Sequence, residues 1–264
     1  MIAIHNLVKT FHQGSINEVL ALSGISLQVN KGDFITVIGS NGAGKSTLLN
    51  CLAGSYPIDS GHIHVDDKDI TRWPEHKRAS QISRVFQDPL LGTCSSLSIE
   101  QNLALANRRG CSHGLGLGVN RQNRDLFRKQ LMQLGLGLED RLKDRVGLLS
   151  GGQRQALTLL MATLVKPQVL LLDEHTAALD PKTALQVLEL TQQLVSEQQL
   201  TALMVTHNMN QALQLGNRLI MLHAGQIILD VSGREKDGMQ VEDLLEKFYA
   251  VRGEEFASDR MLLV

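Results

Sequence analysis

One segment in the first quarter of the chain restricts the possible folds more than any other. It reads "FITVIGSNGAGKSTLLNCLAG", with a β-branched strand pattern at 34–38, a glycine-rich loop at 39–45 and a helical pattern from Ser46 onward. The loop and Ser46 match G-x-x-x-x-G-K-[ST] in the strand–loop–helix context that this pattern requires. A helix that starts behind a glycine loop at the end of a buried strand predicts an α/β fold with an anion-binding turn.

The loop residues have distinct expected roles. The glycines let backbone N–H groups converge on phosphate oxygens, and the helix dipole favours negative charge at the same place. Lys45 is expected to reach the β- and γ-phosphates as a point charge, and the Ser46 hydroxyl to ligate Mg²⁺. A glycine turn that only joined strand to helix would explain neither residue. The segment therefore predicts a nucleoside triphosphate held with Mg²⁺ by Gly39, Ser40, Asn41, Gly42, Ala43, Gly44, Lys45, Ser46 and Thr47.

Composition narrows the class of protein. The 264 residues are 43% hydrophobic, enough for one domain with an appended subdomain, and the net charge of -1 gives no electrostatic case for nucleic acid as a partner. The cysteines Cys51, Cys94 and Cys111 lack metal-ligand spacing, which fits a reducing compartment. The sequence shows neither a signal-peptide pattern nor an apolar run of about 18 residues. We therefore expect a soluble, cytoplasmic chain that does not span a membrane.

The second half supplies adjacent carboxylates. In "PQVLLLDEHTAALD" the apolar run 169–172 is typical of a strand buried on both faces of a parallel sheet. Asp173 and Glu174 then emerge at the carboxyl end of this strand, where such sheets bind ligands. Asp173 is expected to hold Mg²⁺ through its water shell, and Glu174 to act as base or orienter for an attacking water. An acidic turn after a core strand is the simpler alternative.

Two further strand ends carry polar side chains. The segment "TALMVTH" ends on His207, a candidate contact to the γ-phosphate. The segment "ISRVFQDP" places Gln87, which can coordinate Mg²⁺ or the attacking water, just before a break at Asp88-Pro89 that suits a hinge. Either residue alone would be interpreted as a strand cap or loop. The ordered layout of sites in such sheets favours the functional interpretation.

Together with "LSGGQRQ" and "AALD", these segments resemble ATP-binding cassette ATPases in order and spacing, from about Ile2 to Asp230. The phrase "LSGGQ" is highly specific to that family. The resemblance implies a P-loop NTPase (RecA-like) α/β core with a mainly parallel sheet, a small antiparallel β subdomain and an inserted helical subdomain. It implies one ABC ATPase domain over 1–264, with the core at 1–88 and 153–232, the helical signature subdomain at 89–152 and a C-terminal helical extension at 233–264.

The resemblance also implies a site shared between two chains. In the family, the signature loop closes over ATP bound to the other copy of a head-to-tail pair. Only one glycine loop and one signature loop occur here, so a second copy of the chain is needed to complete two sites. The residues implied at this interface are Ser150, Gly151, Gly152, Gln153 and Asp180.

Two other positions are interpreted through the resemblance. Phe11 takes the place of the aromatic residue that stacks on adenine, although an ordinary edge-strand phenylalanine is the alternative. His175 stands where proline is usual, which puts a titratable imidazole next to Glu174. If that imidazole tunes Glu174, the curve of ATPase rate against pH should have a limb near pH 6–7.

The implied function is the ATPase subunit of a membrane transporter. The phrases "DEHTAALDPKTA" and "TCSSLSIEQNLALA" resemble a bacterial importer group that works with an integral membrane permease and a separate substrate-binding protein. The chain would then lie on the inner face of the cell membrane through that permease. A soluble cassette ATPase of the iron–sulfur assembly type is the alternative.

The remaining patterns have simpler interpretations. Residues 1–30 and 60–66 alternate like an antiparallel sheet, and an apolar stripe at 241–251 is typical of a packed helix. His62 and His64 share a strand face, for which a solvated surface is favoured over a metal site. A solvated face is also favoured over a permease contact for the arginines Arg108, Arg109, Arg121, Arg124 and Arg128.

Overall fold

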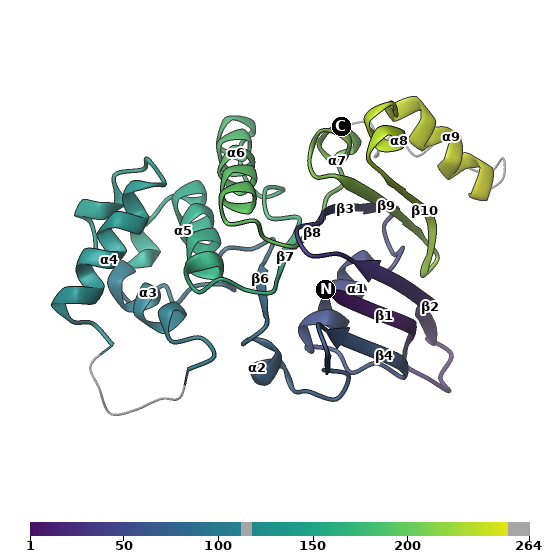
Figure 1. Cartoon of the computed structure of the whole chain (residues 1–264), viewed down its shortest axis with the longest axis horizontal. Helices are drawn as coiled ribbons and strands as arrows, with labels where there is room; N and C mark the ends of the chain where they lie inside the picture. Colours follow the sequence, from purple (N-terminus) through teal and green to yellow (C-terminus); the bar gives the residue numbers. More distant parts are fainter. Residues whose placement is uncertain (112–117, 253–264) are drawn as a thin grey trace. The chain divides into compact units, whose positions relative to one another are not determined.

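The computed structural model describes residues 1–111 and 118–252, and the side chains of residues 1–111 and 118–250. The chain divides into two compact units, which we describe separately. The first unit combines Met1–Arg78 with the chain from Thr201 onward, and the second is Ala79–Leu200. Figure 1 labels the elements of both units.

The first unit contains a small antiparallel sheet with strand order β2-β1-β4-β5. Strand β1 (Ile2–Phe11) pairs with β2 (Val19–Val29) on one side and with β4 (Ser60–Val65) on the other, and β5 (Lys68–Asp69) continues the sheet beyond β4. Alternate residues of β1 and β4 are buried, as expected for a sheet with one face on the core. The predicted antiparallel subdomain is confirmed.

A parallel sheet forms the rest of this unit's core. Strand β3 (Phe34–Gly39), buried at all six positions, pairs in parallel with β8 (Ala202–Val205) and β9 (Arg218–His223). Strand β10 (Gln226–Ser232) joins β9 in antiparallel orientation, and helix α1 (Lys45–Ala53) follows the glycine loop. The predicted order of strand, loop and helix is therefore confirmed, with the helix beginning at Lys45 rather than Ser46.

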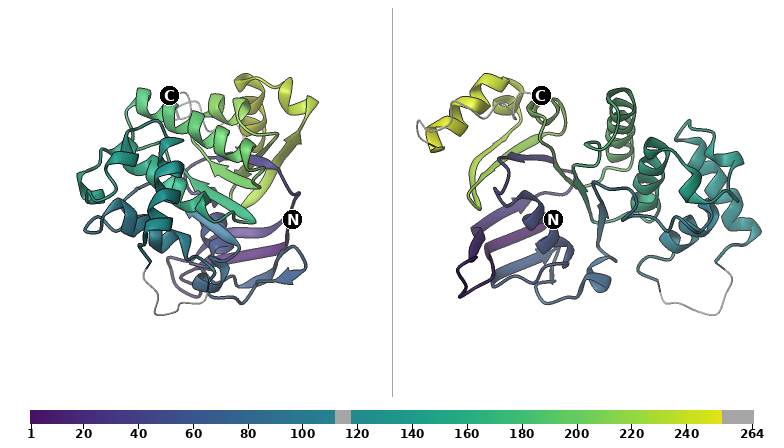
Figure 2. Two further views of the ribbon diagram at one scale, coloured as in Figure 1. Left: turned by 60° about the vertical axis from the view of Figure 1, so that its left-hand side comes forward. Right: turned by 180° about the vertical axis from the view of Figure 1, so that it is seen from behind.

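The helices at the end of the chain pack on this unit. Helix α8 (Arg234–Asp237) and helix α9 (Val241–Arg252) lie beside β9 and β10 in Figure 2, and α7 (Met209–Gln214) shares a core cluster with α9, β9 and β10. Leu244 and Phe248 are buried in that cluster, which confirms the predicted packed helix. The last position of the predicted stripe, Val251, lies outside the described side chains.

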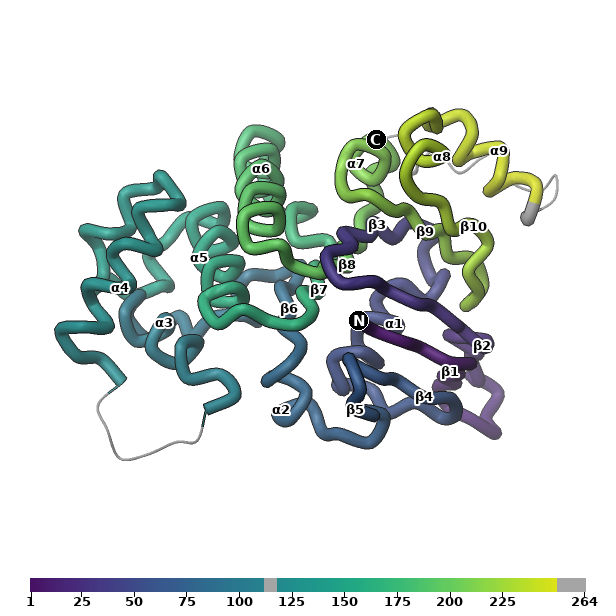
Figure 3. The backbone as a smooth tube through the Cα atoms, in the orientation of Figure 1, coloured from purple at the N-terminus to yellow at the C-terminus, as the bar shows by residue number. Residues whose placement is uncertain are grey.

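The second unit has two parallel strands and a helical cluster. Strand β6 (Ile82–Val85) pairs with β7 (Val169–Asp173); β7 is buried and apolar up to Asp173, as predicted, whereas β6 carries Ser83 and Arg84 between its two apolar ends. Buried Phe127, Leu131 and Leu157 belong to one core cluster in the helical part. The helices, whose course Figure 3 traces, are α3 (Ile99–Asn107), α4 (Arg121–Met132), α5 (Gly151–Leu164) and α6 (Pro181–Glu197), with 3-10 turns at Leu138–Asp140 and Val146–Leu148.

One arginine of the predicted solvated face, Arg109, is half-buried instead. The guanidinium of Arg109 donates hydrogen bonds to the hydroxyl of Ser83 and to the carbonyls of Ala162 and Val165 at the end of α5. Burial lowers its pKa. The carbonyls at a helix C-terminus carry partial negative charge and lack partners in the helix, so they attract a cation. The prediction of a solvated face is wrong for Arg109 because these partners are far away in sequence.

Candidate functional site

The glycine loop of the first unit has the backbone that phosphate binding needs. Gly39 and Gly44 have φ values of 148° and 98°. A Cβ atom at Gly39 would lie 2.1 Å from the carbonyl oxygen of Leu222, and one at Gly44 would lie 2.5 Å from that of Ala21. Both positions therefore require glycine on steric grounds. At Gly44, the N-cap of α1, the first turn of the helix has no capping side chain, which is the arrangement of anion-binding helix starts.

Lys45 and Ser46 differ in exposure. The Lys45 side chain is buried, and its Nζ donates hydrogen bonds to the carbonyl oxygens of Gly39, at 2.8 Å, and Ser40, at 3.0 Å. The loop thus curls around its own lysine. Ser46 is exposed in the first turn of α1. A cation and a hydroxyl are therefore held at one helix start, as a phosphate and its metal ion require.

Phe11, at the end of β1, belongs to an aromatic and charged cluster that sequence reasoning missed. The ring of Tyr56 meets it edge-on, with 5.3 Å between ring centroids and an interplanar angle of 83°. Lys9 lies with its Nζ 5.5 Å from the Phe11 centroid and 2.9 Å from Asp59 Oδ1. The other oxygen of Asp59 accepts a hydrogen bond from the Thr10 amide. These contacts hold the Phe11 side chain in place.

His207 lies at the junction between β8 and α7. The next residue, Asn208, caps α7 by accepting a hydrogen bond from the Gln211 amide, and the Thr206 hydroxyl accepts one from the Asn208 amide. The half-buried His207 therefore lies between a strand and a capped helix start, two residues after the end of β8 at Val205 rather than at the end of the strand itself.

In the second unit, Asp173 is the last residue of β7 and is buried. Its Oδ2 accepts a hydrogen bond of 2.7 Å from Nη2 of Arg84, which lies on the neighbouring strand β6. The Arg84 guanidinium also lies 4.6 Å from the centroid of the Phe86 ring. This ion pair was not predicted, because the pairing of β6 with β7 joins residues 89 positions apart.

Glu174 and His175 begin the turn after β7. Glu174 has a φ of 46°, in the left-handed region that residues other than glycine rarely adopt. His175 is buried, with its Nε2 atom 2.9 Å from the Thr191 hydroxyl on α6. Burial lowers the His175 pKa from 6.5 to about 4. The hypothesis of an imidazole that titrates beside Glu174 near pH 6–7 is therefore not supported, because burial keeps the ring neutral there.

Gln87 and the leucines after it are exposed. Gln87 follows β6 by two residues, and the carbonyl oxygen of Phe86 before it accepts a hydrogen bond from the buried Gln155. Leu90 and Leu91 are 49% and 69% exposed. Two adjacent large apolar side chains are therefore exposed directly after the turn at Asp88-Pro89.

The signature segment forms the start of α5. The Ser150 hydroxyl accepts a hydrogen bond from the Gln153 amide, and the Gln153 side chain accepts one from the Ser150 amide, which makes a capping box. A Cβ atom at Gly152 would lie 2.1 Å from Thr183 Cγ2 on α6. Asp180 caps α6 by accepting a hydrogen bond from the Thr183 amide. The exposed Ser150 and Gly151 are thus held at a rigid helix start.

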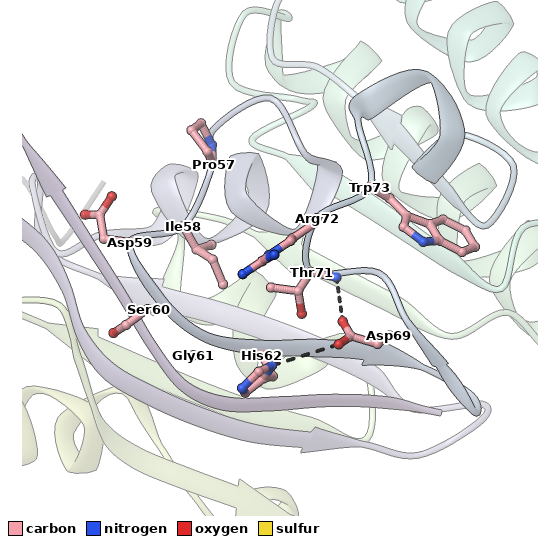
Figure 4. A pocket seen from close by; sticks show the side chains of 10 residues that line it. All are labelled: Pro57, Ile58, Asp59, Ser60, Gly61, His62, Asp69, Thr71, Arg72 and Trp73. Atoms are coloured by element: carbon pink, nitrogen blue, oxygen red, sulfur yellow. Dashed lines mark hydrogen bonds and ion pairs between the residues drawn. The ribbon is translucent and has the colours of Figure 1, made fainter.

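One groove within the first unit is lined by none of the predicted nucleotide-site residues. It has a volume of about 820 Å³ and is lined by residues 57–62, 69 and 71–73. Figure 4 shows two of these lining residues, His62 and Asp69, close together, with Nδ1 and Oδ2 3.9 Å apart. Among residues 1–111 and 118–252 no group of three or more His, Cys, Asp or Glu side chains is arranged to hold a metal ion.

Comparison with known proteins identifies the family. The ABC transporter family model matches residues 22–177, more than half of the chain. The chain therefore belongs to the ABC transporter family, as an ATP-binding cassette that binds and hydrolyses ATP. Mg²⁺ is the general partner of this reaction. The donors on the predicted residues, a hydroxyl, a carboxylate and a side-chain amide, are the oxygen ligands that Mg²⁺ prefers.

Relatives and solved structures agree with this assignment. The chain is 48% identical over 253 residues to a tyrosine transport ATP-binding protein of Clostridioides difficile (strain R20291), covering 95% of this chain and 100% of that protein. It is 35% identical to a methionine import ATP-binding protein, MetN, of Rhizobium etli, covering 79% of this chain and 56% of that protein. A solved dimer of the ATP-binding cassette MJ0796 with ADP and Pi aligns with a TM-score of 0.74 at 26% identity, covering 88% of this chain and 98% of that one.

The fold class that the sequence predicts is also found in a second solved cassette. The cassette MJ1267 in its ADP conformation aligns with a TM-score of 0.76 at 27% identity, over 94% of this chain and 98% of that one. The P-loop α/β class is therefore confirmed. In the part of the chain that the structure describes, no helix is long and apolar enough to cross a bilayer.

Proposed function

We propose that the chain is the ATPase subunit of a bacterial importer, which drives a separate integral membrane permease from the inner face of the cell membrane. Support comes from relatives named for transport of tyrosine, of methionine and of spermidine and putrescine. These names span different small nutrients, so the ATPase itself does not define the cargo. In this proposal the permease and a substrate-binding protein select it.

In this proposal the nucleotide-site residues have the roles that the sequence predicts for them. Phe11 stacks on the adenine, Lys45 contacts the phosphates and His207 contacts the γ-phosphate. Gln87 and Asp173 bind Mg²⁺ together with Ser46, and Glu174 acts as base or orienter for the attacking water. The observation that carries the proposal is the glycine loop. Two of its glycines are sterically required and its lysine is buried, and a turn that only joined a strand to a helix would need neither feature.

A second copy of the chain completes each site in this proposal. Ser150, Gly151, Gly152 and Gln153 of one copy would face the γ-phosphate held by the other, with Asp180 at the interface. ATP binding would close the pair, and hydrolysis with product release would reopen it, so that the permease follows the cycle. Backbone amides at a helix start can donate hydrogen bonds to the γ-phosphate, and they stabilise the negative charge that develops there during hydrolysis.

Glu174→Gln tests the proposed chemistry. The amide keeps the size of the side chain but cannot accept a proton from water, so hydrolysis should fall by roughly two to four orders of magnitude. ATP affinity should stay within about twofold, because positioning and charge stabilisation of the phosphates remain. The two quantities are measured as phosphate release and as equilibrium ATP binding. Turnover close to that of the unchanged protein would remove Glu174 from this role.

A soluble cassette of the iron–sulfur assembly type is the competing function. The exposed leucines favour the permease, since an apolar surface beside a hinge suits a partner helix. Leu91→Glu should spare the ATPase activity of the isolated protein and abolish its recovery from membranes with a polytopic partner. Recovery of the unchanged protein only from the soluble fraction, bound to an assembly scaffold, would favour the competing function.

A further inference from the structure

We propose that His175 and Thr191 form a positioning pair that fixes the backbone at Glu174 and so aims its carboxylate at the attacking water. The inference rests on the proposed function of Glu174. It assigns the imidazole a mechanical task in place of a titrating one.

The direction of the hydrogen bond follows from the partners of Thr191. The Thr191 hydroxyl lies 2.7 Å from the carbonyl oxygen of Val187, which can only accept, so the single hydroxyl proton points there. The same oxygen lies 2.9 Å from His175 Nε2, and it must therefore accept the proton of that nitrogen. His175 is held as the neutral tautomer with hydrogen on Nε2. Both side chains are at most 2% exposed, so water does not compete for the bond.

The backbone beside His175 needs such an anchor. Glu174 has a φ of 46°, and conformations of this kind persist only where the surroundings determine them. The carbonyl oxygen of Glu174 accepts a hydrogen bond of 3.0 Å from the Ala177 amide, which closes a four-residue turn with His175 at its second position. The side chain of His175 ties this turn to α6. Glu174 therefore lies between the buried end of β7 and a residue anchored on a helix.

Proline at position 175 could also fix the backbone of this turn, but by a different means from His175. Proline is favoured at the second position of such turns, because its ring fixes φ near the required value. A proline at 175 would hold the turn through its own backbone, whereas His175 holds it through α6. Both should aim Glu174 similarly, while a side chain of like size without a donor should not.

The experiment compares variants that break the bond with variants that keep it. His175→Phe removes the donor and Thr191→Val removes the acceptor, each with little change in volume. Thr191→Ser keeps the acceptor, His175→Gln keeps a donor, and His175→Pro supplies the turn constraint directly. We expect kcat to fall roughly tenfold or more in the first two variants, since small misplacements of a catalytic group have large effects on rate. The three others should keep at least about half of kcat.

Two further measurements separate positioning from general damage to the fold. Equilibrium ATP affinity and KM should stay within about twofold in every variant, because the phosphate loop is unchanged. In the Glu174→Gln background, His175→Phe should not lower the residual rate further, since the carboxylate that it positions is already absent. This lack of additivity is not expected of a structural role.

Three results would overturn either the positioning role of His175 or the proposed function of Glu174. Normal kcat in both His175→Phe and Thr191→Val, with Glu174→Gln inactive, would overturn the inference and leave the proposed function standing. An equal additional loss of rate in the Glu174→Gln background would overturn it as well. A fully active Glu174→Gln protein would instead overturn the proposed function on which the inference rests.

Discussion

Single side chains at the candidate site combine a proposed role toward ATP with a role in the local fold. Ser150 and Asp180 cap α5 and α6 through hydrogen bonds from backbone amides three residues later. The pKa of Asp180 is lowered by the Thr183 side chain and amide, which donate to the carboxylate. Substitution of such a cap costs about 1 kcal/mol of stability, whatever happens at the nucleotide. A test of either residue therefore needs a control at a cap with no proposed contact to ATP.

The Phe11 cluster leads to the first residue-scale prediction. Phe11→Ala should weaken ATP binding roughly tenfold or more, because stacking of a base on an aromatic ring contributes about 1–3 kcal/mol. Binding of inorganic tripolyphosphate should not change, since it has no base. Tyr56→Phe, which keeps the edge-to-face contact, is the matched control and should leave both affinities unchanged. Equal ATP affinity in Phe11→Ala would identify Phe11 as an ordinary edge-strand residue.

The lowered pKa of His175 leads to a prediction about stability and pH. The folded-state pKa is about 4, against 6.5 for an unperturbed histidine. Between these values the unfolded chain binds more protons, so this contribution to stability is complete above pH 6.5 and is lost as the pH falls toward 4. The unchanged protein should lose about 2 kcal/mol more than His175→Gln between pH 8 and pH 5. The free energy of unfolding of both proteins is measured by chemical denaturation at each pH. Equal losses in the two proteins would show that the His175 ring can be protonated in the folded protein without a cost in stability.

At the scale of elements, three helices end against cations from distant parts of the sequence. Arg78 donates hydrogen bonds to the carbonyls of Cys51 and Leu52 at the end of α1, and Arg109 does the same at the end of α5. Lys236 donates to three carbonyl oxygens at and just after the end of α7, at 2.7–2.9 Å. Burial lowers the pKa of each of these cations. The partial negative charge of each helix end offsets this cost.

Lys236→Met tests the element-scale role. The thioether fills much of the same space but leaves three carbonyl oxygens without their donor, so the free energy of unfolding should fall by roughly 3 kcal/mol. Lys247→Met changes the exposed face of α9 and should stay within about 0.5 kcal/mol of the unchanged protein. Chemical denaturation of both variants measures the difference. Similar losses in both would show that the buried ammonium contributes little.

At the scale of the whole molecule, the glycine loop and the signature loop belong to different units of one chain. The proposed site needs the glycine loop of one copy and the signature loop of another. The proposal therefore concerns an assembly of two chains, and its test has to distinguish contributions in trans from contributions in cis. Variants that damage different loops provide that distinction.

Mixing two inactive variants should restore activity. Lys45→Ala damages the phosphate loop of its own chain, and Ser150→Arg damages the loop offered to the other chain. In a mixed pair one site is whole and the other carries both lesions. With free exchange, about half of the pairs are mixed, so at most about one quarter of the full activity should return.

The control accounts for the capping role of Ser150. Ser98 caps α3 with the same capping box, and Ser98→Arg should lower stability without removing turnover. Closure of the pair with ATP is measured alongside, because restoration also fails where both sites must be whole. A Ser150→Arg protein with normal turnover would rule out the trans role.

The sequence by itself determined those features that are encoded in short segments. The strand, loop and helix around Lys45 and the apolar run before Asp173 were predicted in place, since turn chemistry and hydrophobic period act over a few residues. The family and fold class followed from the order of these segments. The roles of the individual site residues remain predictions.

Only the tertiary structure decided which side chains meet across the chain. His175 was expected beside Glu174 as a titrating group, and the fold places it against Thr191 on α6. The half-buried position of Arg109 at the end of α5 and the pairing of Arg84 with Asp173 were not predicted either. Burial and charge pairing depend on strands and helices that join residues tens of positions apart, and no local pattern records those contacts. Local propensity shaped the elements of this protein, and long-range packing set the chemistry of their ends.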